Sequence, residues 1–128
     1  MIYRLRNRIA KSETEGGFTL IELLVVIVII GILLAIAIPS YLGFRDRASS
    51  SAAQANVRSA LPAVEAYFAD NQTYVGMNLA ALQGIDAGIS STLSVGSVAV
   101  DSYCIESTVG GQDASLTGPG GTIATTTC

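Results

Sequence analysis

A block of 21 residues, 18–38 (FTLIELLVVIVIIGILLAIAI), constrains the fold of this chain more than any other feature. Its only polar side chains are those of Thr19 and Glu22. A helix of about 20 apolar residues is long enough to cross a lipid bilayer. The rest of a 128-residue chain is also too small to bury a helix that is apolar on every side. The block therefore predicts a membrane-spanning segment that stops at Pro39.

Charge is distributed unevenly before and after the beginning of this apolar block at Phe18. Residues 1–17 carry a net charge of +2, whereas residues 18–128 carry −5. Positive charge before an apolar helix stays on the cytoplasmic side of a membrane, so we expect residues 18–38 to insert with their N-terminus inside. Because a nucleic-acid-binding surface would be basic, the acidic remainder predicts no nucleic-acid partner.

The residue types that carry most catalysis and metal binding are sparse. The chain has no histidine, which removes the commonest general base and the commonest metal ligand. Six carboxylates are scattered through the second half, and we interpret them as a solvated surface: Glu65, Asp70, Asp86, Asp101, Glu106 and Asp113. Asp101 and Glu106 are calcium candidates, but they lack the dense oxygen-ligand spacing of an EF-hand. We therefore expect a protein that is not an enzyme and that needs no metal or cofactor.

Residues 40–71 predict an amphipathic helix. Apolar side chains recur there mostly three or four positions apart: Tyr41, Phe44, Ala48, Ala52, Ala55, Ala60, Leu61, Val64, Tyr67 and Phe68. Asp70 and Asn71 are a plausible stop, since Asn tolerates left-handed backbone geometry. Pro39 and Pro62 are expected to kink a continuous helix without breaking it, because the periodicity resumes after each.

Residues 72–128 are rich in Gly, Ser, Thr and Val. We expect a loop over 72–92 with a short helical turn near 79–83, and strands of a small antiparallel sheet over 93–100, 102–109 and 121–127. The glycines of 110–111 and 118–121 are expected to serve turns, and 117–121 is a turn by composition. The predicted class is α+β.

Cys104 and Cys128 are the two cysteines, and neither has a CxxC partner. In an exported chain an even pair of cysteines favours a disulfide, and two free thiols are the alternative. Asn71-Gln72-Thr73 matches a glycosylation sequon, a triplet that is common by chance.

The segment Gly16-Gly17-Phe18-Thr19-Leu20-Ile21-Glu22 has a basic leader before it and an apolar run after it. It resembles the type IV prepilin signal, or class 3 signal peptide. The resemblance implies a leader peptide at 1–17, a transmembrane or filament-core helix at 18–39, an amphipathic helix at 40–71 and a head at 72–128. The implied pilin fold is a long kinked N-terminal helix packed on a small antiparallel sheet. It also implies a C-terminal disulfide loop between Cys104 and Cys128.

The same resemblance implies how the chain works. A prepilin peptidase cuts after Gly17 and usually N-methylates the new N-terminus, Phe18. The chain then passes from the inner membrane, as a single-pass precursor, through an assembly platform into an extracellular filament of its own copies. It would be a major or minor pilin of a type IV pilus, and the segment between Gly31 and Pro39 can unwind on assembly.

Glu22 fits that scheme on physical grounds. An ionised carboxylate inside a bilayer costs on the order of 2.5–3.5 kcal/mol, so such residues usually have a partner. The resemblance implies that this partner is the Phe18 amine, either four residues away in the same chain or on a neighbouring subunit. A wrong offset between subunits would leave a buried charge unpaired, so the pair fixes the register.

Two alternatives remain open from the sequence. One is a pseudopilin of a type II secretion system or of a competence DNA-uptake filament, which shares this N-terminus. The other is a membrane-anchored extracytoplasmic enzyme or binding module, which predicts no cleavage before Phe18.

Overall fold

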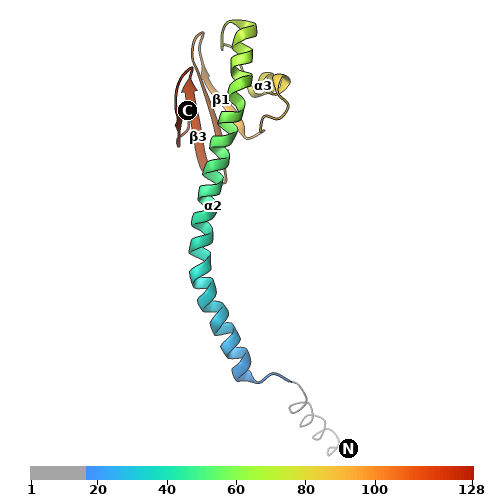
Figure 1. Cartoon of the computed structure of the whole chain (residues 1–128), viewed down its shortest axis with the longest axis vertical. Coiled ribbons are helices and arrows are strands. Elements are labelled where there is room, and N and C mark those ends of the chain that lie inside the picture. Colours follow the sequence, from blue (N-terminus) through green and yellow to red (C-terminus); the bar gives the residue numbers. More distant parts are fainter. Residues whose placement is uncertain (1–16) are drawn as a thin grey trace, which may run out of the picture. The chain divides into compact units, whose positions relative to one another are not determined.

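The computed structural model describes residues 17–128, so the predicted leader, apart from Gly17, lies outside the described residues. The described elements are two helices, α2 (Leu20–Asn71) and α3 (Leu79–Ile85), and four strands, β1 (Leu93–Val98), β2 (Tyr103–Val109), β3 (Gln112–Gly118) and β4 (Ile123–Ala124) (Figure 1). The chain divides after Tyr41 into two compact units. The predicted α+β class, one long helix and a small antiparallel sheet, is confirmed.

Helix α2 is 52 residues long and passes through both Pro39 and Pro62 without a break, as expected. Each proline removes one backbone donor from the helix. Near the first of them, the Ser40 hydroxyl donates a hydrogen bond of 3.3 Å to the Ile36 carbonyl. The predicted helices at 18–39 and 40–71 are therefore one continuous helix from Leu20 to Asn71.

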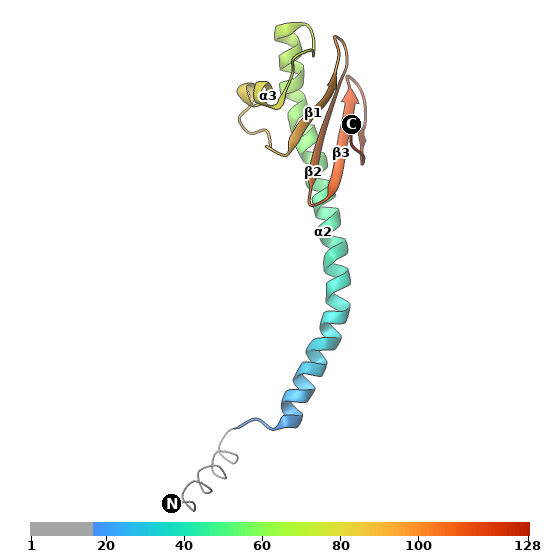
Figure 2. The same ribbon diagram turned by 180° about the vertical axis from the view of Figure 1, so that it is seen from behind.

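The second unit, Leu42–Cys128, contains a four-stranded antiparallel sheet in the order β1-β2-β3-β4 (Figure 2). The predicted strands at 93–100 and 102–109 correspond to β1 and β2, and the predicted turn of helix near 79–83 corresponds to α3. Strand β3 was missed, because its sequence QDASLTG has only two apolar residues, Ala114 and Leu116, and neither is β-branched. All seven of its residues nevertheless pair with β2, which the Gly110–Gly111 turn places directly beside it.

The prediction for 121–127 was mostly wrong, since only Ile123 and Ala124 form a strand there. Gly120 has a positive φ of 78°, and the segment 119–122 between β3 and β4 is a turn and coil. Pairing with β3 is limited to Ser115↔Ala124 and Leu116↔Ile123. The threonine-rich composition of this segment therefore led to a predicted strand that is longer than the observed one.

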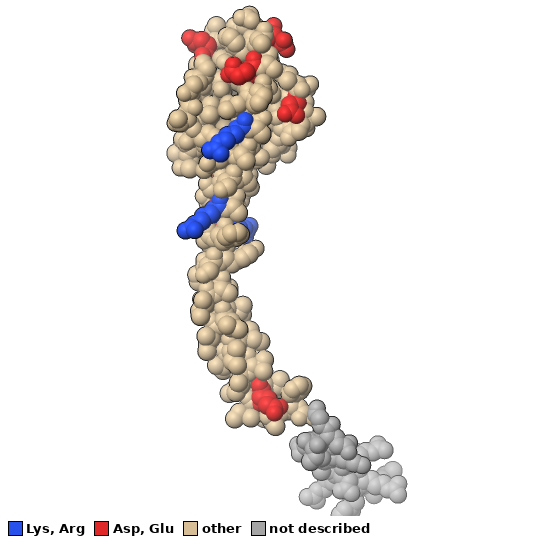
Figure 3. Space-filling model, in the orientation of Figure 1, with Lys and Arg blue, Asp and Glu red and all other residues tan. Residues whose placement is uncertain are grey.

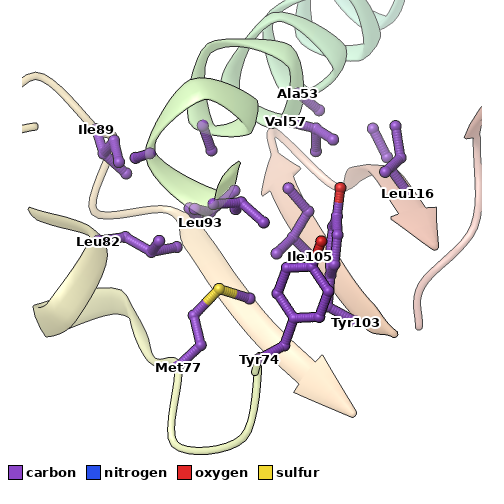
Figure 4. Packing of buried hydrophobic residues seen from close by; sticks show 14 residues of the cluster. Ala53, Val57, Tyr74, Met77, Leu82, Ile89, Leu93, Tyr103, Ile105 and Leu116 are labelled. Carbon is purple, nitrogen blue, oxygen red and sulfur yellow. The ribbon is translucent and has the colours of Figure 1, made fainter. Parts of the chain in front are cut away.

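The core of this unit lies between α2 and one face of the sheet (Figure 4). Side chains of α2 meet Tyr103 and Ile105 of β2 and Leu116 of β3. The buried helix residues are Ala53, Val57, Ala60, Ala63 and Val64. The predicted stripe was wrong over its first half, where five of its residues are exposed: Tyr41, Phe44, Ala48, Ala52 and Ala55. Small residues occur all around this part of α2, so periodicity could not choose the face that the sheet covers.

A satisfied polar cluster also fixes α2 to the sheet. The Asn56 amide donates hydrogen bonds to the hydroxyls of Ser107, at 3.2 Å, and Thr92, at 3.1 Å. These two hydroxyls lie 3.0 Å apart. Because Ser107 is buried, its hydroxyl would be costly without these partners.

The Gly110–Gly111 turn yields a matched pair of substitutions. Both glycines have positive φ, 56° and 80°, which costs any other residue roughly 1–2 kcal/mol. A Cβ at Gly110 would also lie 2.5 Å from the Ser49 hydroxyl oxygen, whereas a Cβ at Gly111 meets nothing within 4 Å. We expect Gly110→Ala to lower the free energy of unfolding more than Gly111→Ala, as measured by urea titration of the full chain in detergent. Equal losses would mean that α2 does not press on this turn.

Three aromatic rings, from the C-terminal part of α2, the loop after it and β2, pack together at the edge of the core. The rings of Phe68 and Tyr74 lie 4.7 Å apart, as do those of Tyr74 and Tyr103. The Tyr74 hydroxyl donates to the Glu65 carboxylate at 3.5 Å. Burial, followed by the charge of Glu65 and the neighbouring Tyr74, raises the pKa of Tyr103 to about 12. Burial and Glu65 also raise the pKa of Tyr74 above its ordinary value.

These shifts predict an alkaline limit to stability. A pKa that is higher in the folded state means that folding favours the protonated phenol. The stabilisation is therefore complete below about pH 10, the unfolded value, and is lost as the pH rises towards about 12. Urea midpoints should be flat below about pH 9 and fall above it. Tyr103→Phe should remove most of that fall, and an unchanged slope in this variant would contradict the assignment.

Candidate assembly site at the start of the apolar helix

The start of α2 is built by reciprocal hydrogen bonds. Residues 17–19 are not helical, and α2 begins at Leu20. The Glu22 N–H donates to the Thr19 hydroxyl oxygen at 3.3 Å, and the Thr19 N–H donates to a Glu22 carboxylate oxygen at 3.1 Å. This is a capping box, in which the N-cap residue and the third helical residue satisfy each other's free backbone donors.

The capping box was missed in the sequence, although the spacing Thr-x-x-Glu at the head of an apolar run is its known pattern. Our interpretation paired Glu22 only with the amine of Phe18. While Gly17 is attached, that nitrogen is a peptide nitrogen and carries no charge. In the described chain, Glu22 is instead held by the helix start, whose partial positive charge also favours a carboxylate.

The side chains around Glu22 are apolar. Glu22 is one of the residues that line an open, apolar hollow; the others are Phe18, Ile21, Leu23, Val25 and Val26. Phe18 is 81% exposed and Ile21 is 69% exposed. Burial of this apolar surface lowers the free energy. It would also bury the Glu22 carboxylate, which is costly unless a cation pairs with it.

Helix α2 is also the one described helix long and apolar enough to cross a membrane. Its most apolar 18-residue window has a mean hydropathy of 3.3, and none of that window is buried. All residues from 17 to 41 are exposed, including Gly31 and Pro39. Both of these lie within continuous helix, because α2 runs unbroken from Leu20 to Asn71.

In the head, Cys104 and Cys128 form a disulfide with their Cα atoms 6.0 Å apart. The Glu106 carboxylate accepts a hydrogen bond from the Cys128 N–H. A Cβ at Gly96 would lie 2.9 Å from the Cβ of Cys128, so β1 also passes close to the bridge. Glu106, a calcium candidate in the sequence, thus holds the C-terminal cysteine. No cluster of three or more metal-ligating side chains occurs between residues 17 and 128.

The sequon residue Asn71 lies at the end of α2. Its side-chain amide donates a hydrogen bond of 2.9 Å to the Tyr67 carbonyl. The next residue, Gln72, has a positive φ of 57°, as at many helix ends. The Asn71 amide therefore acts as a helix-end cap in this structure.

These features define a class of protein. It has a capped N-terminal helix start with an acidic residue, an exposed apolar helix of membrane length, and a following small antiparallel head closed by a disulfide. Comparison with known proteins narrows the class. The family model described as the prokaryotic N-terminal methylation motif matches residues 14–38.

Three relatives carry the comparison further. The major component of the type IV wide pilus of Thermus thermophilus, PilA4, is 44% identical over 94 residues, which cover 70% of each chain. The type IV major pilin PilA of Myxococcus xanthus is 45% identical over 63 residues, 49% of this chain and 29% of that protein. A type II secretion system core protein G of Pseudomonas aeruginosa is 36% identical over 77 residues, 60% of this chain and 51% of that protein. The chain belongs to the type IV pilin family.

Proposed function

We propose that this chain is the precursor of a structural subunit of a type IV pilus. The observation that carries the proposal is the 44% identity to a wide-pilus major component over 70% of both chains. The methylation motif at 14–38 and the capped, exposed apolar helix support it. The precursor would sit in the inner membrane as a single-pass protein, and the mature chain would belong to an extracellular filament.

Processing is the first step of the proposed mechanism. A prepilin peptidase cuts after Gly17, where a glycine offers least steric resistance to threading an extended backbone. The cut converts the Phe18 nitrogen into an amine, which methylation keeps cationic. This places a positive charge one helical turn from Glu22. Before cleavage, the Glu22 carboxylate accepts a hydrogen bond from the Thr19 N–H at the N-terminus of α2, where the helix dipole also favours a negative charge.

Assembly is the second step. An assembly platform brings subunits together, and residues 18–38 move from lipid into the apolar core of the filament. The Glu22 carboxylate then pairs with a Phe18 amine, its own or a neighbour's, and the pairing selects the offset between subunits. Between Gly31 and Pro39 the helix unwinds locally, since glycine has a high conformational entropy cost in a helix and proline removes a backbone donor.

A second candidate within the family is a pseudopilin. The 36% identity to a type II secretion core protein favours it over unrelated classes. The two candidates differ in the product: a pilus subunit is abundant in filaments sheared from the cell surface, whereas a pseudopilin stays with its secretion system.

Processing can be tested on the full chain. Co-expressed with a prepilin peptidase in membranes, it should lose the mass of residues 1–17 and begin at Phe18. Gly17→Arg should block the cut, and Gly16→Ala serves as the matched control that is still cut. An uncut wild-type chain, beside a control prepilin that is cut, would contradict the proposal and favour a membrane-anchored binding module.

A further inference from the structure

The C-terminal segment crosses the outer face of the sheet. Tyr103 and Ile105 of β2 belong to the hydrophobic core, so Cys104 between them lies on the opposite face. Strand β4 pairs only with β3, yet Cys128, shortly after its end, is bonded to Cys104 in β2. Because β3 lies between β4 and β2, the chain bends after β4 and passes over β3. We call residues 125–128 the C-terminal strap.

Glu106 holds the strap through a contact that involves neither sulfur atom. It follows Cys104 by two positions in β2 and therefore lies on the same face of the sheet. Its carboxylate accepts a hydrogen bond from the Cys128 N–H. Its cross-strand neighbours, Ser94 and Ser115, have small side chains that leave room for the strap. All four strap residues are exposed, so burial does little to place Cys128 and the Glu106 contact matters correspondingly more.

The position that Cys128 occupies is tightly bounded on the side of β1. A Cβ at Gly96 would lie 2.9 Å from the Cβ of Cys128 and 3.2 Å from its sulfur. Separations this short leave no space for a side chain between β1 and the strap. Cys128 therefore reaches Cys104 from a narrow range of positions, so its placement before the bond forms affects how fast the bond can form.

In the reduced chain the strap has a competing place on the sheet. The two residue pairs between β3 and β4 fix a register. Continued in that register, the β-branched threonines at 125–127 would pair with the first three residues of β3, which in the described part of the chain pair with β2 alone. Cys128 would then lie six positions along β3 from Thr117, the partner of Cys104. At 3.3–3.4 Å per residue, this separates the two thiols by roughly 20 Å.

We propose that Glu106 is a positioning residue for closure of the disulfide between Cys104 and Cys128. Closure takes two exchange steps with a disulfide oxidant. The thiolate of one cysteine first attacks the oxidant, which gives a mixed disulfide and releases one thiol. The thiolate of the other cysteine then attacks the sulfur of the first, which forms the intramolecular bond and releases a second thiol. Two electrons and two protons pass from the cysteines to the oxidant.

Glu106 acts on the second, intramolecular step. By accepting the Cys128 N–H it keeps the strap over β2 and away from a longer β4, so the two sulfurs meet more often. A carboxylate also has a direct electrostatic effect, because a negative charge near a thiol disfavours the thiolate. That effect slows attack, whereas positioning speeds it. Glutamine at position 106 separates the two, since it keeps a carbonyl acceptor and lacks the charge.

The test measures closure and opening separately on the full chain in detergent. The reduced chain is mixed with glutathione disulfide and quenched with an alkylating reagent, and intact mass distinguishes the reduced, mixed-disulfide and closed forms. Glu106→Ala should slow conversion of the mixed disulfide to the closed form about tenfold, because a charge-assisted hydrogen bond is lost. It should leave opening by reduced glutathione within about threefold of wild type. Glu106→Gln should close within about threefold of wild type.

The matched control is Asp113→Ala, which removes another carboxylate from the same face of the sheet. Asp113 accepts a hydrogen bond of 2.6 Å from Thr108, its partner on β2, and we expect closure within about twofold of wild type. Figure 3 shows the acidic side chains on the visible face of the unit Leu42–Cys128 in several separate places. Each substitution therefore removes one separate charge.

Two results would overturn the positioning role. If Glu106→Ala opens about tenfold faster while it closes at the wild-type rate, Glu106 stabilises only the finished head. If both Glu106 variants close faster than wild type, the carboxylate acts through its charge on the thiols. The inference concerns the head alone, so neither result bears on the pilus proposal.

Discussion

Replacing Glu22 by leucine should leave cleavage after Gly17 intact and reduce filaments about a hundredfold or more. The change removes the carboxylate that is expected to neutralise the Phe18 amine inside the filament core. Leaving one member of a buried ion pair without its partner costs about 3–5 kcal/mol, which corresponds to a factor of at least a hundred in assembly. The measurement is the ratio of mature chain in sheared filaments to mature chain in membranes.

The control for Glu22→Leu is Thr19→Val, which removes the capping hydroxyl and keeps the carboxylate. Loss of an N-cap hydroxyl costs about 1 kcal/mol of helix stability. The Thr19 backbone N–H can still donate to Glu22, as it does in the structure. We expect this variant to assemble. If both variants lose filaments equally, Glu22 acts through the capping box and not through the Phe18 amine.

Removing the disulfide should have the second large effect. With Cys104→Ser and Cys128→Ser together, the free energy of unfolding of the head should fall by about 3–4 kcal/mol, because the closed loop no longer restricts the unfolded chain. The head is small, and a sheet of four short strands on one helix face is a thin core. Urea unfolding of the full chain in detergent, followed by circular dichroism, measures the loss.

The matched control for the disulfide is Thr117→Val. The Thr117 hydroxyl lies 3.5 Å from the Cys104 sulfur, so this change alters the surroundings of the bridge without breaking it. We expect a change below about 1 kcal/mol. Reduction of the wild-type chain should reproduce the double serine variant. A double variant as stable as wild type would show that Glu106 and the sheet hold the C-terminal segment unaided.

The sequence predicted the elements that have a strong local cause. The 21-residue apolar block, the continuous helix through two prolines and the β-branched strands β1 and β2 all follow from composition or periodicity. Strand β3 does not, since its residues become a strand only by pairing with β2 across the Gly110–Gly111 turn. The buried face of α2 was also beyond the sequence, because alanines surround the helix and the sheet selects Ala53 over its neighbour Ala52.

Some residues of the candidate site could be identified from local sequence spacing, whereas other contacts depend on the fold. Gly17, Phe18 and Glu22 were singled out by a resemblance that depends on local spacing, which a sequence displays directly. The hydrogen bond from Cys128 to Glu106 joins residues 22 positions apart and depends on how the C-terminal segment crosses the sheet. The Thr19–Glu22 capping box is the exception, because its pattern was present in the sequence and was overlooked.

The proposed function is tested most directly by the intact mass and N-terminal sequence of this chain in filaments sheared from the cell surface. We expect an abundant chain that begins at N-methylated Phe18 and weighs two hydrogens less than its fully reduced form. A chain that still carries residues 1–17 and occurs only in membranes would contradict the assignment of this protein as a pilus subunit.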